Sequence, residues 1–158
     1  VTYIHEVRAL ARLETIRYSI EKVITAELNQ GVLGPLFGDR LLFVAHGYVI
    51  AGIDMEKIAP EDLWLDGTSL YVRLPAAEVL TYALDEERSY VYDRDTGFLT
   101  HGDVNLETTA RQVAVQEILN AALEDGILEQ AQQNAEVYLL RFFLALGYDQ
   151  VVFVDPAP

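Results

Sequence analysis

The segment Leu41–Asp54 constrains the fold more than any other part of the sequence. Apolar side chains occupy both alternating sets of positions here, which is the pattern of a β-strand covered on both faces. Gly47 and Gly52 lie inside the segment, and glycine within a strand indicates a bulge or the close approach of another backbone. We therefore expect a strand in the middle of a compact body, packed on either side.

The other strand patterns are shorter or cover only one face. Glu14–Leu28 alternates apolar and polar residues, which predicts a long antiparallel strand with one face in water. Asp66–Gly67, between Leu63–Leu65 and Leu70–Leu74, predicts a β-hairpin. Pro75 should end its second strand, because proline has no N–H to donate. Two more strands are expected, at Arg88–Asp93 and Val151–Val154.

Residues Leu106–Leu146 repeat apolar side chains at spacings of three and four, the period of an amphipathic helix. One continuous helix of this length would extend roughly 60 Å at about 1.5 Å per residue, whereas a compact chain of this size is about 40 Å across. Either Asp125–Gly126 divides the segment into two packed helices, or the extra length lies against a second copy or a partner. We favour a long helix with a bend.

These patterns together predict an α+β fold. An antiparallel sheet of about five strands would carry the long C-terminal helical segment, followed by a short final strand. No internal repeat, low-complexity tract or linker interrupts the 158 residues, so we expect a single domain over residues 1–158.

Composition excludes several classes of function. The chain has no cysteine, which excludes disulfides, thiolate metal sites and cysteine nucleophiles. Its net charge of -14 argues against nucleic acid as a partner, because Lys and Arg at phosphates drive that binding. The apolar runs are too short to cross a bilayer. The chain begins at Val1 rather than at methionine, so we expect a processed product or a piece of a longer protein.

Few residue patterns in the sequence point to catalysis. The three serines lie outside any Gly-x-Ser-x-Gly motif, no phosphate-binding Gly-Lys loop is present, and the three histidines are too scattered for a His-x-x-x-His zinc site. His46 in the central strand and Asp54 at its end are the candidate acid–base pair of an enzyme. The alternative, which we favour, is a buried histidine satisfied by one hydrogen bond.

Two further groups of residues have an alternative, structural explanation. Asp93 and Asp95 begin a calcium-loop-like run, but Gly97 falls at the fifth position and Val104 at the twelfth, where the loop needs glycine at the sixth and glutamate at the twelfth. We interpret this run as a tight turn and keep the two aspartates as metal candidates. Aromatic residues on the expected strands could form an exposed interface or fill the core. They are Tyr18, Tyr48, Trp64, Tyr71, Tyr90 and Tyr92.

Several motifs occur in a set order along the chain: Leu13-Glu14-Thr15, the Gly-x-Val-x-Ala-Gly-Ile-Asp run within Ala45–Asp54, Leu70–Pro75, Ile127–Ala131 and Leu146–Tyr148. This order resembles one uncharacterised bacterial family of unknown function, DUF4230. The likeness covers nearly the whole chain. In physical terms, Gly47 and Gly52 would admit another backbone beside the central strand, and Asp54 would cap the turn that leaves it.

The resemblance also implies a location and a class of function. Members of the family often look anchored in the membrane by an N-terminal helix, with this domain on the extracytoplasmic side of the bacterial cell envelope. No catalytic residue is established for the family, so the resemblance implies none. We expect a non-enzymatic binding or scaffolding module without a cofactor, which meets a protein partner or a second copy through its C-terminal helix and meets the membrane only through a missing anchor. The alternative is an enzyme that uses His46 and Asp54.

Overall fold

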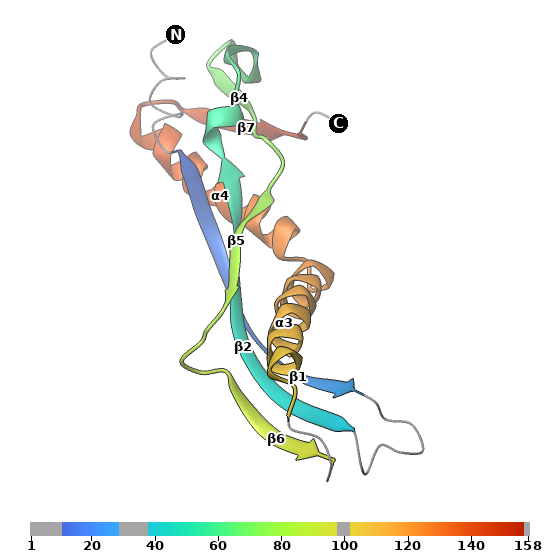
Figure 1. Ribbon diagram of the computed structural model, residues 1–158. Helices are drawn as coiled ribbons and strands as arrows, with labels where there is room; N and C mark the ends of the chain where they lie inside the picture. The colour runs from blue at the N-terminus through green and yellow to red at the C-terminus, as the bar shows by residue number, and fades with distance from the viewer. Residues whose placement is uncertain (1–10, 29–37, 98–101, 157–158) are drawn as a thin grey trace. The chain divides into compact units, whose positions relative to one another are not determined.

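The computed structural model describes residues 11–28, 38–97 and 102–156 and confirms the α+β class (Figure 1). The hairpin and the final strand lie where the patterns predicted them. The strands are β1 (Arg12–Leu28), β2 (Asp39–Asp54), β3 (Leu63–Asp66), β4 (Ser69–Arg73), β5 (Glu78–Leu84), β6 (Tyr90–Thr96) and β7 (Gln150–Val154). The helices are α3 (Val104–Glu124) and α4 (Ile127–Ala145), with two short 3-10 turns at Met55–Lys57 and Pro60–Asp62.

The strands form two sheets rather than one sheet of about five strands. The first has four strands: β2 lies between β1 and β5, and β6 also pairs with β2, antiparallel to it. The second has the order β3-β4-β7, with an antiparallel β3–β4 hairpin and a parallel β4–β7 pair. The buried β4 side chains Leu70 and Val72 belong to an apolar cluster that includes residues of α4. Val151 and Phe153 of β7 pack against the same cluster, which favours the pairing of β7 with the hairpin.

The chain divides into two compact units, each with its own core. The first contains residues 11–17, 50–81 and 126–156, and the second contains residues 18–28, 38–49, 82–97 and 102–125. Three of the boundaries fall inside β1, β2 and β5, so these strands continue from one unit into the other. Sequence patterns do not indicate this division, because no loop or linker marks it.

In the first unit, α4 and the β3-β4-β7 sheet share an apolar cluster. The helix supplies Ala135, Leu139 and Phe143, each fully buried and one turn apart. Ile53 and Met55, at the end of β2 and just after it, pack into the same cluster. Burial of this kind is the main favourable term in folding, at about 25 cal/mol per Å² of apolar surface.

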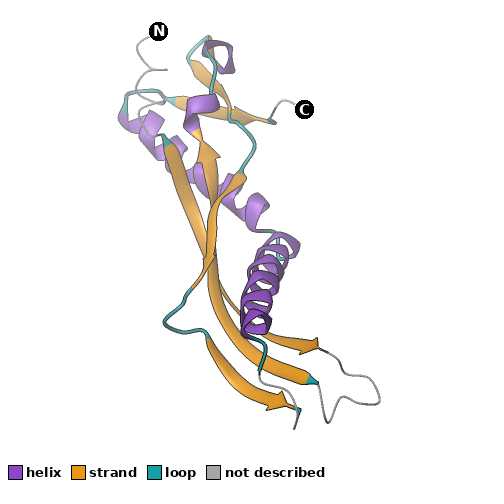
Figure 2. Ribbon diagram, viewed as in Figure 1, coloured by secondary structure: helices purple, strands orange, loops and turns teal. Residues whose placement is uncertain are grey.

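In the second unit, α3 packs on one face of the sheet (Figure 2). Its buried residues recur every four positions: Leu106, Ala110, Ala114, Ile118 and Ala122. Three of the five are alanines, which lets the helix axis come close to the sheet. Ile118 contacts β2 at Gly47, where an added Cβ would lie 2.7 Å from the Ile118 Cδ1 atom.

The helical segment is divided, so the single bent helix is wrong and the alternative of two helices is correct. α3 ends at Glu124, α4 begins at Ile127, and Gly126 between them has a φ of 79°. This left-handed conformation cannot continue a right-handed helix, and glycine adopts it without steric cost.

β2 is central in its sheet, but only one of its faces is fully covered. The side chains at odd positions from Leu41 to Ile53 are buried, whereas Leu42, His46, Tyr48 and Ile50 on the other face are half-buried. The expectation of a strand packed on both faces is therefore wrong for these four positions, although Val44 on the same face is buried. Their apolar character reflects partial cover, which sequence alone does not distinguish from full burial.

Candidate functional site

The glycines of β2 make the expected close backbone contacts. A Cβ added at Gly52 would lie 1.9 Å from the Leu13 carbonyl oxygen of β1. At Gly47 the nearest backbone atom would be the Ala83 carbonyl oxygen of β5, at 2.8 Å. Asp54 caps the 3-10 turn after β2 by accepting a hydrogen bond from the Glu56 N–H at 3.1 Å. Pro75 follows the end of β4 at Arg73.

His46 and Asp54 have different partners and are not brought together. The His46 Nε2 atom lies 3.4 Å from the Glu21 Oε2 atom on β1, and the imidazole is half-buried. Asp54 lies eight residues further along β2, and its carboxylate caps the turn described above. At about 3.3 Å of rise per residue, extended backbone of that length separates the two side chains.

Next to the main chain of His46, the strand pairing along one side of β2 is interrupted by a break between β5 and β6. β6 pairs with β2 as far as Val44, opposite Tyr90, and past the break the His46 carbonyl accepts the Asp85 N–H at 2.8 Å. Residues 85–89 leave the ladder as a turn between these two pairings. The buried Ser89 hydroxyl fills the gap, because it accepts from the His46 N–H at 3.0 Å and donates to the His46 carbonyl at 3.1 Å.

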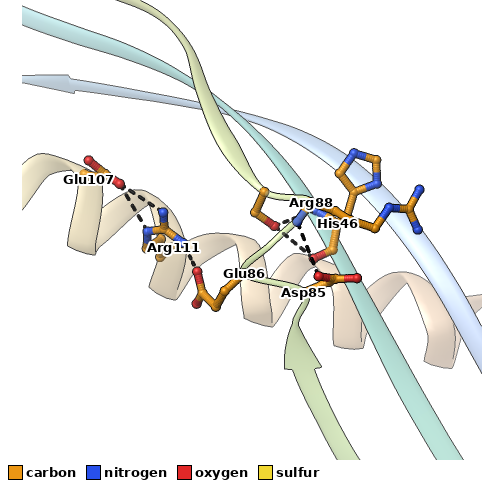
Figure 3. A network of polar contacts seen from close by, with 7 residues as sticks. His46, Asp85, Glu86, Arg88, Glu107 and Arg111 are labelled. Atoms are coloured by element: carbon orange, nitrogen blue, oxygen red, sulfur yellow. Dashed lines mark hydrogen bonds and ion pairs between the residues drawn. The ribbon is translucent and has the colours of Figure 1, made fainter.

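Arg111 connects this turn to helix α3 (Figure 3). Its guanidinium pairs with Glu86 of the turn and, at 3.0 Å, with Glu107 one helical turn earlier. The same guanidinium stacks 4.8 Å above the ring of the buried Phe43 on β2. The cluster around His46 thus connects strand, turn and helix through hydrogen bonds and ion pairs.

Removing the Ser89 hydroxyl should destabilise the second unit. In Ser89→Ala the His46 N–H loses its partner at a buried position, so we expect the free energy of unfolding to fall by about 1–3 kcal/mol. Urea denaturation followed by circular dichroism measures this. Ser69→Ala is the matched control, because the Ser69 hydroxyl bonds to Gln150 at an exposed site. Equal effects of the two substitutions would contradict the role given to Ser89.

A second polar cluster surrounds Asp39, which is fully buried at the start of β2. Arg94 of β6 donates to both carboxylate oxygens, at 3.2 and 2.6 Å. The Asp103 N–H at the start of α3 donates at 2.7 Å, and the Arg94 guanidinium also reaches the Asp103 carbonyl at 2.7 Å. Sequence reasoning missed this cluster, because Asp39 precedes the apolar run and Arg94 stands between the two aspartates of the suspected metal loop.

The Asp39 cluster makes stability depend on pH. The Arg94 hydrogen bonds hold the pKa of Asp39 below its usual 3.8, although burial opposes the shift. A carboxylate whose pKa is lower in the folded state contributes stability above its unfolded pKa and loses it as the pH falls. We therefore expect the difference in unfolding free energy between the wild type and Asp39→Asn to be constant near neutral pH and to shrink below pH 3.8. Urea titrations at stepped pH measure it, and a difference independent of pH would contradict it.

Asp93 and Asp95 face away from this cluster. Their register partners on β2 are Leu42 and Arg40, and these four exposed or half-exposed residues line a cavity of about 180 Å³. Arg40 pairs with Glu27 at 3.3 Å. Among the residues that the structure describes, no three His, Asp or Glu side chains are placed to share a metal ion.

The aromatic residues are distributed over different surfaces. Trp64 and Tyr71 stack across the β3–β4 hairpin with ring centroids 5.5 Å apart, and the Arg73 guanidinium lies over the Trp64 ring. Tyr90 and Tyr92 are exposed on β6, in the other unit. The six aromatic residues therefore belong to two sheets: Trp64 and Tyr71 lie in the β3-β4-β7 sheet, and the other four lie in the four-stranded sheet.

The outer side of α4 exposes three large apolar side chains. Val137, Tyr138 and Leu144 are 53%, 48% and 44% exposed. Arg141, also exposed, lies between them on the helix. We call these four residues the α4 patch. Tyr138 precedes the fully buried Leu139, but it points about 100° away from it round the helix and is exposed.

A comparison of the sequence with family models confirms the resemblance that the motifs, among them the run within Ala45–Asp54, indicated. A family described only as a protein of unknown function, DUF4230, matches residues 5–153. The chain belongs to the DUF4230 family. No curated protein and no solved structure gives a significant match to this DUF4230 domain. None of the helices described for the domain is both long enough and apolar enough to span a bilayer.

Proposed function

We propose that this DUF4230 domain is a non-enzymatic binding or scaffolding module of the bacterial cell envelope, and that it docks through the α4 patch. The observation that carries the proposal is the second apolar surface of α4. A surface helix of a globular protein normally has one apolar stripe, which faces the core. α4 has that buried stripe and also exposes Val137, Tyr138 and Leu144 on its outer side.

The residue types of the α4 patch favour an interface. Tyrosine and arginine are enriched at the centres of protein–protein contacts, where their side chains combine apolar area with polar groups. An exposed cluster of large apolar side chains around one charge is typical of such contacts. The candidate catalytic residues support the same conclusion, because the His46 imidazole pairs with Glu21 and the Asp54 carboxylate caps a turn.

The extracytoplasmic location is part of the proposal and is supported by the family. Its members often look anchored by an N-terminal helix, and the full-length protein would then hold this domain at the membrane surface. Protease treatment of spheroplasts tests the location: the domain should be cleaved while the membrane is intact. Protection until lysis would contradict it.

Site-specific crosslinking tests the docking surface. A photo-crosslinking amino acid in place of Tyr138 in the full-length protein, expressed in its own bacterium, should give discrete adducts. Tyr92 is the matched control, because it is an even more exposed tyrosine on β6, outside the patch. Adducts from position 92 but none from position 138 would overturn the assignment of the docking surface.

A further inference from the structure

We infer that the α4 patch binds the outer face of α3 in a second copy of the chain, with Arg141 of one copy against Glu117 of the other. The inference rests on the proposed function and names the occupant of its docking surface. The contact joins two different surfaces, so it is heterologous rather than two-fold symmetric.

Arg141 is an isolated base in an acidic region. No other Lys or Arg occurs in residues 112–158, which contain seven acidic residues. Within the described part of the chain, Arg141 forms no salt bridge, whereas Arg73, Arg94 and Arg111 each have a carboxylate partner. An exposed guanidinium surrounded by apolar side chains is best complemented by a carboxylate that has apolar neighbours of its own.

The outer face of α3 offers such a carboxylate. Val113 is 43% exposed, and the exposed Glu117 lies one turn further along the same side of the helix. Leu123, which is 41% exposed, lies about 120° further round the helix. Val113 precedes Glu117 by four residues, just as Val137 precedes Arg141. Glu117 forms no salt bridge with any described residue, although Glu86 and Glu107 nearby in the unit both pair with Arg111.

Charge also decides against symmetric contacts. Two α4 patches packed antiparallel would bring Arg141 against its own copy, and two α3 faces would bring carboxylates together; like charges in contact disfavour a wrong pairing. Of the three pairings, only α3 against α4 brings opposite charges together, and an exposed valine, Val113 or Val137, lies one turn before each charge. One helix face on another buries less than the roughly 1,200 Å² of standard interfaces, and both copies carry -14, so the association is weak and depends on concentration.

Charge reversal tests the contact in the chain of 158 residues at 0.15 M ionic strength (a Debye length of about 8 Å). Sedimentation equilibrium of the wild type should show association that grows with concentration. Arg141→Glu and Glu117→Arg should each weaken it at least tenfold, because each places like charges in contact. An equimolar mixture of the two variants should associate again, since each copy then offers a surface complementary to the other. Unchanged melting curves confirm that both variants fold.

Three outcomes would overturn the inference: a wild type that stays monomeric at every concentration, single variants that associate as the wild type does, or a mixture that is not rescued. Failure here can be told apart from failure of the proposed function. If position 138 crosslinks to other proteins while the chain stays monomeric, the docking surface holds and its occupant is a different protein.

Discussion

Asp39→Asn should lower the free energy of unfolding by about 3 kcal/mol. Removing one partner of a buried ion pair typically costs about 3–5 kcal/mol, because the other charge stays in place without compensation. We expect the lower end of that range, since the Arg94 side chain is 28% exposed and can recruit water when its carboxylate is gone. The expected loss of stability is large because the Asp39 carboxylate connects several elements of the second unit.

Asp39 joins three elements at the end of the second unit. It begins β2, binds Arg94 of β6 and accepts the N–H of Asp103, the residue that caps α3. The Asp103 carboxylate in turn accepts the Asn105 N–H at 2.8 Å. Losing the charge of Asp39 therefore weakens strand pairing and the start of the helix together, and the loss should appear as one cooperative transition.

Asp95→Asn is the matched control for this substitution. Asp95 pairs in register with the neighbouring residue of β2, Arg40, but its side chain is exposed. Surface charges of this kind contribute about 0–1 kcal/mol. Urea denaturation of the two variants gives the comparison, and a loss below about 1 kcal/mol for Asp39→Asn would show that the buried pair does not hold the unit together.

Local patterns predicted the elements better than their assembly. The alternation in β1, the Asp66–Gly67 turn and the helical period of α3 and α4 are short-range signals, and the structure has each of them. The division into two units depends on which side chains meet across long stretches of chain. Leu70 packs with Phe143 in one cluster, and no periodicity in either segment identifies the other as its partner.

The polar clusters were missed for a related reason. The roles of Ser89 and Asp39 depend on hydrogen bonds to backbone groups far away in sequence. Ser89 bonds to the His46 main chain, and Asp39 accepts the Asp103 N–H. A serine before a strand and an aspartate before an apolar run have many uses, so residue type alone does not select one. The glycines of β2 were different, because few explanations other than a close contact account for glycine inside an apolar strand.

Gly52→Ala should destabilise the first unit by about 3 kcal/mol or more. The new Cβ would lie 1.9 Å from the Leu13 carbonyl oxygen and 3.0 Å from the Glu14 Cα atom, so it meets backbone on the adjacent strand. Overpacking against flexible side chains costs about 1–3 kcal/mol. Backbone cannot move aside without separating β1 from β2, and the effect should therefore reach or exceed the top of that range.

Alanine substitutions at two other glycines should destabilise the protein less than Gly52→Ala. At Gly47 the Cβ would meet the tip of Ile118, which can rotate, and the Ala83 carbonyl oxygen at 2.8 Å, so Gly47→Ala should cost less than Gly52→Ala. At Gly67 the Cβ would meet nothing within 4 Å, and the only penalty is a φ of 62°, worth about 1 kcal/mol. Thermal and urea unfolding of the three variants should rank Gly52 first and Gly67 last. If Gly52→Ala were as stable as Gly67→Ala, β1 and β2 would not be in contact at Leu13, and the packing described for this unit would be wrong.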